Sequence, residues 1–166
     1  PGQSLPRGRV TGGSTAVNTC IFLRGVPEDY DDWSDRGNPE WEWDNALKTF
    51  CRLERDLDFG DETYHGDAGP ITVRRYPHEE LTELHQAFLA TAEELGFPAC
   101  PDQNDPTAWG SGPQPMNKLG QLRVSTASAY LAPARLRPNL EIRGDCHTNR
   151  LITERGRVSG VEVINS

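Results

Sequence analysis

Long apolar runs are missing from this sequence, and so are the signatures of several common catalytic sites. No window approaches the roughly 20 apolar residues of a membrane-spanning helix, and the first residues, "PGQSLPRGR", lack the apolar core of a signal peptide. No lysine follows the paired glycines at 12 and 13, and neither Gly-x-Ser-x-Gly nor His-Glu-x-x-His occurs. These absences argue against a membrane-spanning protein, a P-loop hydrolase, a serine hydrolase with a nucleophile elbow and a helical zinc protease.

Cysteine pairs and positive charge are also scarce. The four cysteines form no Cys-x-x-Cys pair, which disfavours a structural zinc site or any other metal centre and predicts reduced thiols in the cytoplasm. With 17 basic against 25 acidic residues the formal net charge is -8, so nucleic acid is not expected as a partner. The acidic stretches 27–35 and 53–62 are predicted to be solvated surface, with a metal site as the alternative.

The length of 166 residues allows one well-buried domain, although only 35% of the residues are hydrophobic. The 13 prolines and 16 glycines indicate much irregular chain. The chain does not begin with methionine, which is consistent with a start inside a longer protein. Helical and strand patterns mix without a regular βαβ alternation, so the predicted fold class is α+β.

Local patterns predict several elements. A short helix follows residue 26, and a second helix begins at Pro39 and carries Trp43, Leu47 and Phe50 at helical spacing. Trp41 and Trp43 are interpreted as packing residues of this helix, with ligand stacking as the alternative. The run 71–73 predicts a strand. A long amphipathic helix is predicted over 78–95, with one apolar face and a C-terminal cap at Gly96; the face comprises Leu81, Leu84, Phe88, Ala92 and Leu95.

The second half of the chain begins with a long stretch of turn residues, 98–120, a kind of segment that is often functional. Ser125 is predicted to cap a short helix that runs through Tyr130 and is stopped by Pro133. The last residues predict strands joined at 155–157.

The histidines give little support for catalysis or metal binding. His78 and His85 lie seven residues apart on the predicted helix, and His65 and His147 stand beside a glycine turn and in a strand-like segment. A structural or surface role is the preferred interpretation for all four, and no catalytic residue is assigned.

The stretch "GRVTGGSTAVN", residues 8–18, holds the clearest candidate for a binding site. Gly12 and Gly13 permit a positive φ and close approach of the backbone to a ligand. Ser14 and Thr15 would then cap a helix whose free N–H groups favour a pyrophosphate. The same residues also suit an ordinary tight turn.

The stretch "GRVTGGSTAVNTCIFLRGVPEDYD" resembles the first signature of the glucose-methanol-choline (GMC) oxidoreductases, a family of flavoenzymes. Thr11 departs from the aliphatic residue usual in the family, and Lys48-Thr49-Phe50 replaces a common Pro-Tyr-Phe. The segments "HGDAGP", "GQLRVSTASAYLAP" and "RPNLEIRGDCHTNRLI" follow in the family's order, so the resemblance spans essentially the whole chain. The signature matches at Gly8, Arg9, Val10, Gly12, Gly13, Ser14, Thr15, Val17, Asn18, Phe22, Gly25 and Asp31.

The resemblance, which includes the choline oxidase or dehydrogenase and aryl-alcohol oxidase branches without deciding between them, implies an FAD site. It implies that FAD is bound without a covalent link, because Val17 stands where some members carry a flavin-linking histidine. Thr19 is also a candidate to lie near the substrate. The residues implied to line FAD are Val10, Gly12, Gly13, Asn18, Thr19, Cys20, Ile21 and Thr148.

The resemblance also implies what this chain lacks. The family's Gly-x-Gly-x-x-Gly fingerprint, its second signature and its catalytic histidine are absent. The expected chain is therefore an internal fragment with most of a substrate-binding domain and parts of the FAD-binding domain. Its segments would be 1–34 and 121–166 for the FAD-binding domain and 35–120 for the substrate domain.

The function that follows is oxidation of an alcohol CH–OH group by hydride transfer to FAD. This chain alone is expected to be inactive, to bind FAD weakly or not at all, and to self-associate through unpaired strands. Two alternatives stay open. One is a non-enzymatic binding module built on the long helix and the 98–120 loop, and the other is a lone substrate domain with a regulatory role.

Overall fold

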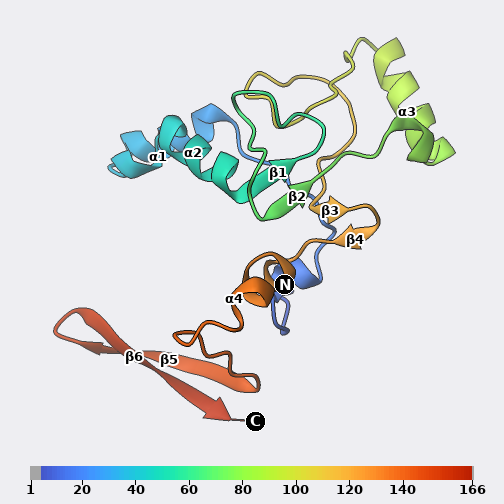
Figure 1. The fold of residues 1–166 in the computed structure, drawn as a ribbon. Helices are drawn as coiled ribbons and strands as arrows, with labels where there is room; N and C mark the ends of the chain where they lie inside the picture. Colours follow the sequence, from blue (N-terminus) through green and yellow to red (C-terminus); the bar gives the residue numbers. More distant parts are fainter. Residues whose placement is uncertain (1–4, 166) are drawn as a thin grey trace, which may run out of the picture. The chain divides into compact units, whose positions relative to one another are not determined.

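The computed structural model describes residues 5–165 and divides the chain into two compact units. The first unit ends at Leu131, and the second runs from Ala132. Short strand pairs and separate helices make up the fold, which confirms the α+β class (Figure 1). The domain boundaries predicted at 34 and 120 stay a prediction. Within the described residues, no helix has the length and apolarity needed to cross a membrane.

The first unit opens with a glycine turn and a helical pair. The turn continues into the short 3₁₀ helix η1 (Gly13–Ala16). Helix α1 (Pro27–Asp35) begins at a proline, and the Asp29 carboxylate accepts a hydrogen bond from the Val26 N–H at its start (3.1 Å). Pro39 does not begin the next α-helix. It opens the 3₁₀ helix η2 (Pro39–Trp41), and helix α2 (Trp43–Leu53) follows.

Aromatic rings hold α1, η2 and α2 together. The ring of Tyr30 lies 5.6 Å from those of Trp43 and Phe50, and the ring of Trp33 lies 5.3 Å from that of Trp41. Such edge and tilted contacts stabilise a pair beyond the area they bury. These contacts support the interpretation of Trp41 and Trp43 as packing residues.

A small parallel strand pair forms the centre of the first unit. Strand β1 (Glu54–Asp56) pairs with the predicted strand β2 (Ile71–Val73), and all three residues of β2 are buried. Beyond β2, Met116 bridges to Arg74 and to Ile21. The hairpin of β3 (Lys118–Leu119) and β4 (Leu122–Arg123) turns at Gly120, whose φ is +56°.

The long helix predicted over 78–95 is wrong at its beginning. A 3₁₀ turn, η3 (His78–Glu80), comes first, Leu81 is extended, and helix α3 (Glu83–Glu94) starts only after Thr82. The Thr82 hydroxyl accepts a hydrogen bond from the His85 N–H (3.4 Å), which makes it the N-cap. The predicted C-terminal cap is confirmed, because Gly96 has a φ of +92° and donates to the Glu93 carbonyl.

The apolar face expected on α3 is not a buried one. Leu84 is 77% exposed and Phe88 is 65% exposed, whereas Leu81 and Leu89 are half-buried. The helix stands at the edge of its unit (Figure 1).

After residue 126, a π-helical turn, η4 (Ala127–Leu131), leads into the short helix α4 (Ala132–Ala134). The Ser125 hydroxyl accepts from the Ser128 N–H at 3.4 Å, as its capping role predicts. Pro133 does not stop the helix where expected, since it lies inside α4.

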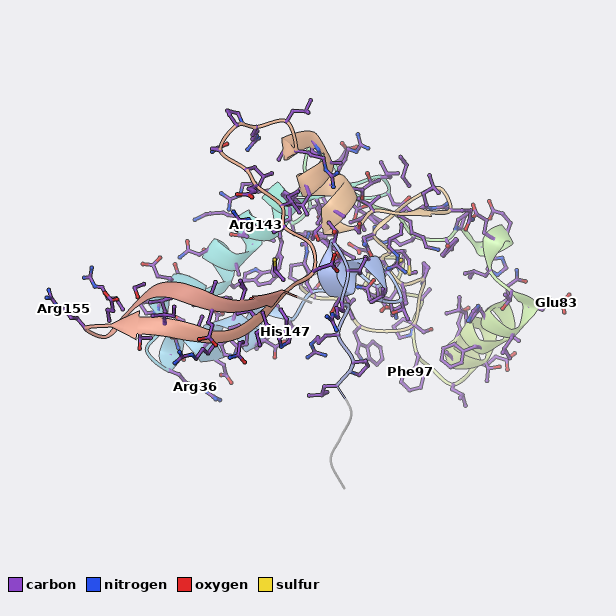
Figure 2. All side chains as sticks on the ribbon, turned by 90° about the horizontal axis from the view of Figure 1, so that it is seen from below. Arg36, Glu83, Phe97, Arg143, His147 and Arg155 are labelled. Carbon is purple, nitrogen blue, oxygen red and sulfur yellow. The ribbon has the colours of Figure 1, made fainter. Side chains whose placement is uncertain are left out.

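The second unit is dominated by one hairpin. Strands β5 (Cys146–Glu154) and β6 (Arg157–Asn165) pair antiparallel around Arg155 and Gly156, both at positive φ, as predicted for this region. Every residue of β5 is exposed, and Figure 2 shows side chains projecting from the hairpin, with Arg155 at its turn. A two-stranded hairpin of this kind has little stability of its own.

Candidate functional site

The glycine turn has a geometry that demands glycine. Gly12 and Gly13 have φ values of +92° and +56°, and the Gly13 N–H donates to the Val10 carbonyl (2.8 Å). A β-carbon on Gly8 would lie 2.4 Å from the Gly13 carbonyl oxygen. The chain therefore folds tightly back on itself between residues 8 and 13.

Ser14 and Thr15 do not cap a helix, contrary to expectation. They lie inside η1, which is one short turn with Gly12 at its N-cap position and no side-chain cap. The Thr15 hydroxyl donates to the Gly12 carbonyl (2.6 Å) and accepts from the Thr126 N–H (3.1 Å). Because the turn is so short, it is a rigid corner and not a pyrophosphate-binding helix terminus.

Arg123 holds the C-terminal end of this corner, at residues 15–18, by hydrogen bonds. Its guanidinium donates to the Asn18 side-chain oxygen (2.6 Å), the Asn18 carbonyl (2.5 Å) and the Thr15 carbonyl (3.2 Å). Thr126 adds a hydrogen bond to the Gly12 carbonyl (3.1 Å). The segment 123–126 thus holds residues 12–18 by side-chain contacts that sequence reasoning did not assign.

Residues 18–21, here called the cofactor-lining segment, present mixed surfaces. Asn18, Thr19 and Ile21 are exposed, but Cys20 is 4% exposed, so only its backbone could meet a ligand. Cys20 has a φ of +67°, which is uncommon for a residue with a side chain. Its N–H donates to the Asn18 side chain (3.0 Å), and its carbonyl accepts from the Asn117 N–H (2.9 Å).

The structure brings together seven of the eight predicted cofactor residues, all in the first unit. Val10, with 53% of its surface exposed, stands on the glycine turn beside Gly12 and Gly13. Thr148 is an exposed residue of β5 opposite Val163, and it belongs to the second unit.

A buried charge cluster lies at the centre of the first unit, and it was not predicted from the sequence. Its carboxylates come from β1 and from the loop after α3, and its cations come from three further segments. Each of its side chains is at most 6% exposed. The members are Arg24, Glu54, Asp56, His65, Arg75 and Asp102.

His65 is the hub of the buried charge cluster. Its Nδ1 lies 2.6 Å from a Glu54 oxygen, and its Nε2 lies 2.8 Å from an Asp102 oxygen. Arg75 bonds both oxygens of Asp56 (2.8 and 2.7 Å) and reaches Asp102 (2.5 Å). Arg24 pairs with Glu54.

The protonation states follow from these contacts. Burial lowers the pKa of His65, but hydrogen bonds to Asp102 and Glu54 outweigh it and raise the pKa to about 9. Burial raises the pKa of Asp102, but the hydrogen bonds from His65 and the Asn104 N–H, with the charge of Arg75, lower it to about 2. At neutral pH three cations therefore face three carboxylates, and the cluster carries no net charge.

The pairing of these charges bears on whether the cluster could hold a metal ion. Glu54, Asp56 and His65 offer ligand atoms within 4.8 Å of one another, a spacing that would suit a metal ion. Arg24 already pairs with Glu54, however, and Arg75 bonds both oxygens of Asp56, so both carboxylates have a cationic partner within the chain. We interpret the group as an ion-pair network. The interpretation of 53–62 as solvated surface is wrong for Glu54 and Asp56, which are buried.

Comparison with known proteins shows the family to which the chain belongs. The family model described as GMC oxidoreductase matches residues 3–166. The chain belongs to this family. A 5-(hydroxymethyl)furfural oxidase from Methylovorus sp. is 36% identical over 98% of the chain and 31% of that protein. An oxygen-dependent choline dehydrogenase from Photobacterium profundum is 35% identical over 95% of the chain and 28% of that protein.

Solved structures agree with this placement. Pyridoxine 4-oxidase from Mesorbium loti is similar with a TM-score of 0.87 and 33% sequence identity, covering 96% of the chain and 31% of that structure's chain. The GMC chain thus spans less than a third of the length of these relatives, which fits a fragment.

The resemblance to GMC enzymes included "HGDAGP", and the structure gives that motif a physical role. His65 supplies the central cation of the buried charge cluster. Its neighbour Gly66 passes so close to α2 that a β-carbon would lie 1.8 Å from the Cys51 carbonyl oxygen. Gly69 likewise approaches the Glu54 backbone, at 2.4 Å. This motif was the one sequence signal that could have located the cluster.

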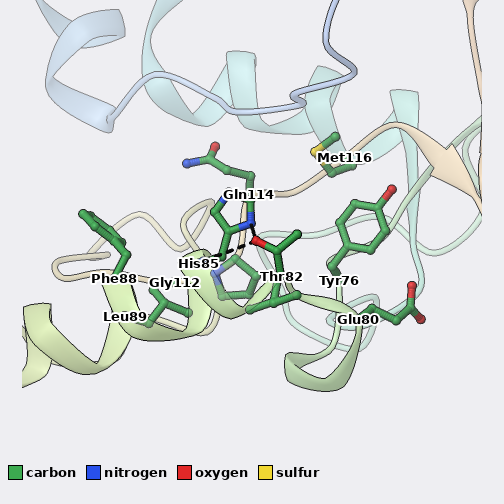
Figure 3. Close-up of a pocket in the computed structure, with 11 residues that line it drawn as sticks. Tyr76, Glu80, Thr82, His85, Phe88, Leu89, Gly112, Gln114 and Met116 are labelled. Atoms are coloured by element: carbon green, nitrogen blue, oxygen red, sulfur yellow. Dashed lines mark hydrogen bonds between the residues drawn. The ribbon is translucent and has the colours of Figure 1, made fainter.

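A pocket of about 480 Å³ opens between α3 and the segment 112–116 (Figure 3). Thr82 and His85 lie on its α3 side, hydrogen-bonded to each other at 3.0 Å (Thr82 Oγ1 to His85 Nδ1). The other side includes Gly112, Gln114 and Met116. Part of the 98–120 stretch therefore lines a pocket, although none of the predicted cofactor residues does.

The pKa shifts predict a bell-shaped dependence of stability on pH. The His65 contribution, about 3 kcal/mol, is complete below pH 6.5 and is lost as pH rises through about 9, because the folded-state pKa is the higher one. The Asp102 contribution is complete above pH 3.8 and is lost as pH falls through about 2, because its folded-state pKa is the lower one. Stability should therefore be greatest between these limits, from about pH 4 to 6.5.

Urea unfolding of the whole protein between pH 5 and 9.5 measures the alkaline arm of this profile. The arm should flatten in His65→Gln, which cannot take up the proton. An alkaline arm of the same slope in that variant would show that another group causes it.

Proposed function

We propose that the whole protein oxidises an alcohol CH–OH group with FAD as the hydride acceptor. Membership of the GMC family, whose members bind FAD, supports the chemistry. The relatives are named for action on 5-(hydroxymethyl)furfural, choline and pyridoxine, which all carry an alcohol group. The observation that carries the proposal for this chain is the rigid corner formed by residues 8–18.

The residues of this corner fit a flat cofactor lying against them. At Gly13 the backbone is open to close approach, since a β-carbon there would meet no atom within 4 Å, and Val10 and Ile21 expose apolar side chains, 53% and 47% exposed. The cofactor would supply the hydride acceptor. This chain would supply one wall of the site, formed by Val10, Gly12, Gly13 and residues 18–21. The role of Thr148 beside the adenine end stays a prediction from the resemblance.

The role of this wall would be to orient the cofactor and to exclude water from it. The contacts of Arg123 and Thr126 fix the backbone of the wall before any ligand arrives, so little conformational freedom is lost on binding. The turn has no free helix terminus for a pyrophosphate, so the phosphate-binding groups must come from another part of the whole protein. Thr19, exposed on the cofactor-lining segment, is proposed to lie near the substrate.

The test is reduction of the bound flavin by alcohols. The purified whole protein should show a flavin absorption spectrum that bleaches when a primary alcohol is added without oxygen. 5-(Hydroxymethyl)furfural, choline and pyridoxine form the first panel, with the corresponding aldehydes as controls. A colourless protein that takes up no FAD would contradict the proposal and favour the non-enzymatic binding module.

A second expectation concerns the flavin linkage. Val17 has no nucleophilic ring nitrogen, so FAD should be held without a covalent bond. Acid precipitation of the whole protein should leave the flavin in the supernatant, where its absorbance is measured. Colour that stays with the washed pellet would contradict this expectation.

The 166-residue chain alone is proposed to be inactive and to bind FAD weakly or not at all. It contains only one wall of the site, and Thr148 lies in a different unit from the rest. Titrating FAD into the chain and following flavin fluorescence measures this affinity. Cytoplasmic location and self-association through exposed strands are further proposals, the second supported by the exposure of β5.

A further inference from the structure

The backbone that follows the cofactor-lining segment is held by one buried side chain, that of Asn104. Its Nδ2 donates to the Phe22 carbonyl (3.1 Å), and its Oδ1 accepts from the Arg24 N–H (3.0 Å). Asn104 is 3% exposed. A carboxamide thus takes the place of a neighbouring strand and satisfies two peptide groups on residues 22–24 at once.

Asn104 is in turn fixed by the buried charge cluster. The Asn104 N–H donates to an Asp102 oxygen (3.0 Å), and Asp102 is gripped by His65 (2.8 Å) and Arg75 (2.5 Å). Arg24 connects residues 22–24 directly to the cluster, since its guanidinium pairs with Glu54 and donates to the Tyr64 carbonyl (2.6 Å). The contacts form one continuous path from His65 to residues 22–24.

The other contacts of this stretch do not duplicate that path. The Phe22 N–H donates to the Pro115 carbonyl (2.8 Å), and Ile21 bridges to Met116. Residues 20–24 are therefore held by two sets of contacts. One set is with the backbone of 115–117, and the other is with Asn104 and the buried charge cluster.

We propose that Asn104 is a positioning residue for the FAD site. Its side chain fixes the cofactor-lining segment by hydrogen bonds to the two peptide groups that follow this segment, and the buried charge cluster keeps Asn104 in place. This inference rests on the proposed function, because it takes residues 18–21 to line FAD. The hydrogen bonds of Asn104 go to Phe22, Arg24 and Asp102, which are not among the predicted cofactor residues, so it acts through the backbone.

The first test is Asn104→Ala in the whole protein, with Thr72→Val as the matched control. Thr72 is equally buried (4% exposed) and loses one side-chain contact, from Arg55 (3.1 Å), but it lies off the path. Loss of both Asn104 contacts should raise the FAD dissociation constant about tenfold or more, since the cofactor-lining segment would then have to be ordered when FAD binds. FAD titration into the apoprotein, followed by fluorescence, measures it, and thermal unfolding of the apoprotein gives the stability of each variant.

The visible circular dichroism of the bound flavin provides a readout that a general loss of stability would not move. It should change in Asn104→Ala and stay unchanged in Thr72→Val. If both variants bind FAD within about twofold of the parent protein (a margin of ~0.4 kcal/mol), with the same spectrum, the proposal is overturned.

Asn104→Asp is nearly isosteric and keeps the inference testable if the alanine variant does not fold. In its protonated form the new carboxyl group can still donate to the Phe22 carbonyl, whereas its ionised form would repel that oxygen. The charged group in contact with this position is the Asp102 carboxylate on its own loop, whereas Arg24 contacts it through the backbone N–H and directs its guanidinium to Glu54 and the Tyr64 carbonyl. FAD affinity of the variant should therefore approach that of the parent protein at pH 5 and fall behind it at pH 8.

The proposed function and this inference fail in different ways. A parent protein that takes up no FAD overturns both. A parent protein that binds FAD, together with an Asn104→Asp variant whose affinity relative to the parent does not change with pH, overturns the inference alone.

Discussion

Replacing Arg75 with methionine should lower the free energy of unfolding by about 3–5 kcal/mol. Methionine keeps much of the side-chain volume but removes the guanidinium that bonds both oxygens of Asp56 and also reaches Asp102. Those two carboxylates would then share His65 as their nearest cation at 3.3 and 2.8 Å. An uncompensated negative charge would be left in a site where Asp56 and Asp102 are at most 5% exposed.

Arg55→Met is the matched control for this prediction. Arg55 lies on β1 beside Asp56, but it is exposed, and its guanidinium donates to the Thr72 hydroxyl. Its loss should change the free energy of unfolding by less than about 1 kcal/mol. Urea unfolding of the two variants of the whole protein compares them. Equal losses of unfolding free energy in the two variants would mean that the buried charge cluster stabilises the fold no more than a surface contact does.

Gly66→Ala is expected to destabilise the protein by about 3 kcal/mol or more, because overpacking here meets backbone atoms. The added β-carbon would lie 1.8 Å from the Cys51 carbonyl oxygen and 2.9 Å from that of Glu54. The chain has little room to move away. The Gly66 N–H donates to Glu54 (3.2 Å), and its carbonyl accepts from the Asp56 N–H (2.8 Å).

Gly144→Ala provides the comparison for this substitution. A β-carbon at Gly144 meets no atom within 4 Å, and its backbone is not in the left-handed region. That variant should keep its free energy of unfolding within about 0.5 kcal/mol of the parent. The thermal midpoint and the soluble yield of both variants measure the contrast. A Gly66→Ala protein as stable as Gly144→Ala would show that α2 can shift away from the loop.

The elements that were predicted well are those with local causes. Pro27 and Asp29 mark the start of α1, and Arg155-Gly156 marks the turn of the β5–β6 hairpin, because each acts within a few residues of itself. The start of α3 was misplaced although its signal was present. Thr82 is a good N-cap residue, and it outweighed the apolar spacing that had extended the helix back to residue 78.

The candidate site was only partly predictable, for a physical reason. The glycine turn is encoded locally, and the family resemblance gave its meaning. Arg123 and Thr126 hold that turn from more than 100 residues away, and no local pattern announces such a contact. The buried charge cluster is similar: Glu54 and Asp56 look like surface residues until the cationic side chains of His65 and Arg75 are brought against them.

Arg123 has an electrostatic consequence for the glycine turn. Its guanidinium bonds three neutral oxygens, and among residues 5–165 no carboxylate forms an ion pair with it. Its charge is therefore not cancelled locally, and it adds a positive potential to the corner in a chain whose net charge is -8. An anionic molecule approaching this corner would be attracted at low ionic strength, and added salt would screen that attraction within about 10 Å at 0.1 M.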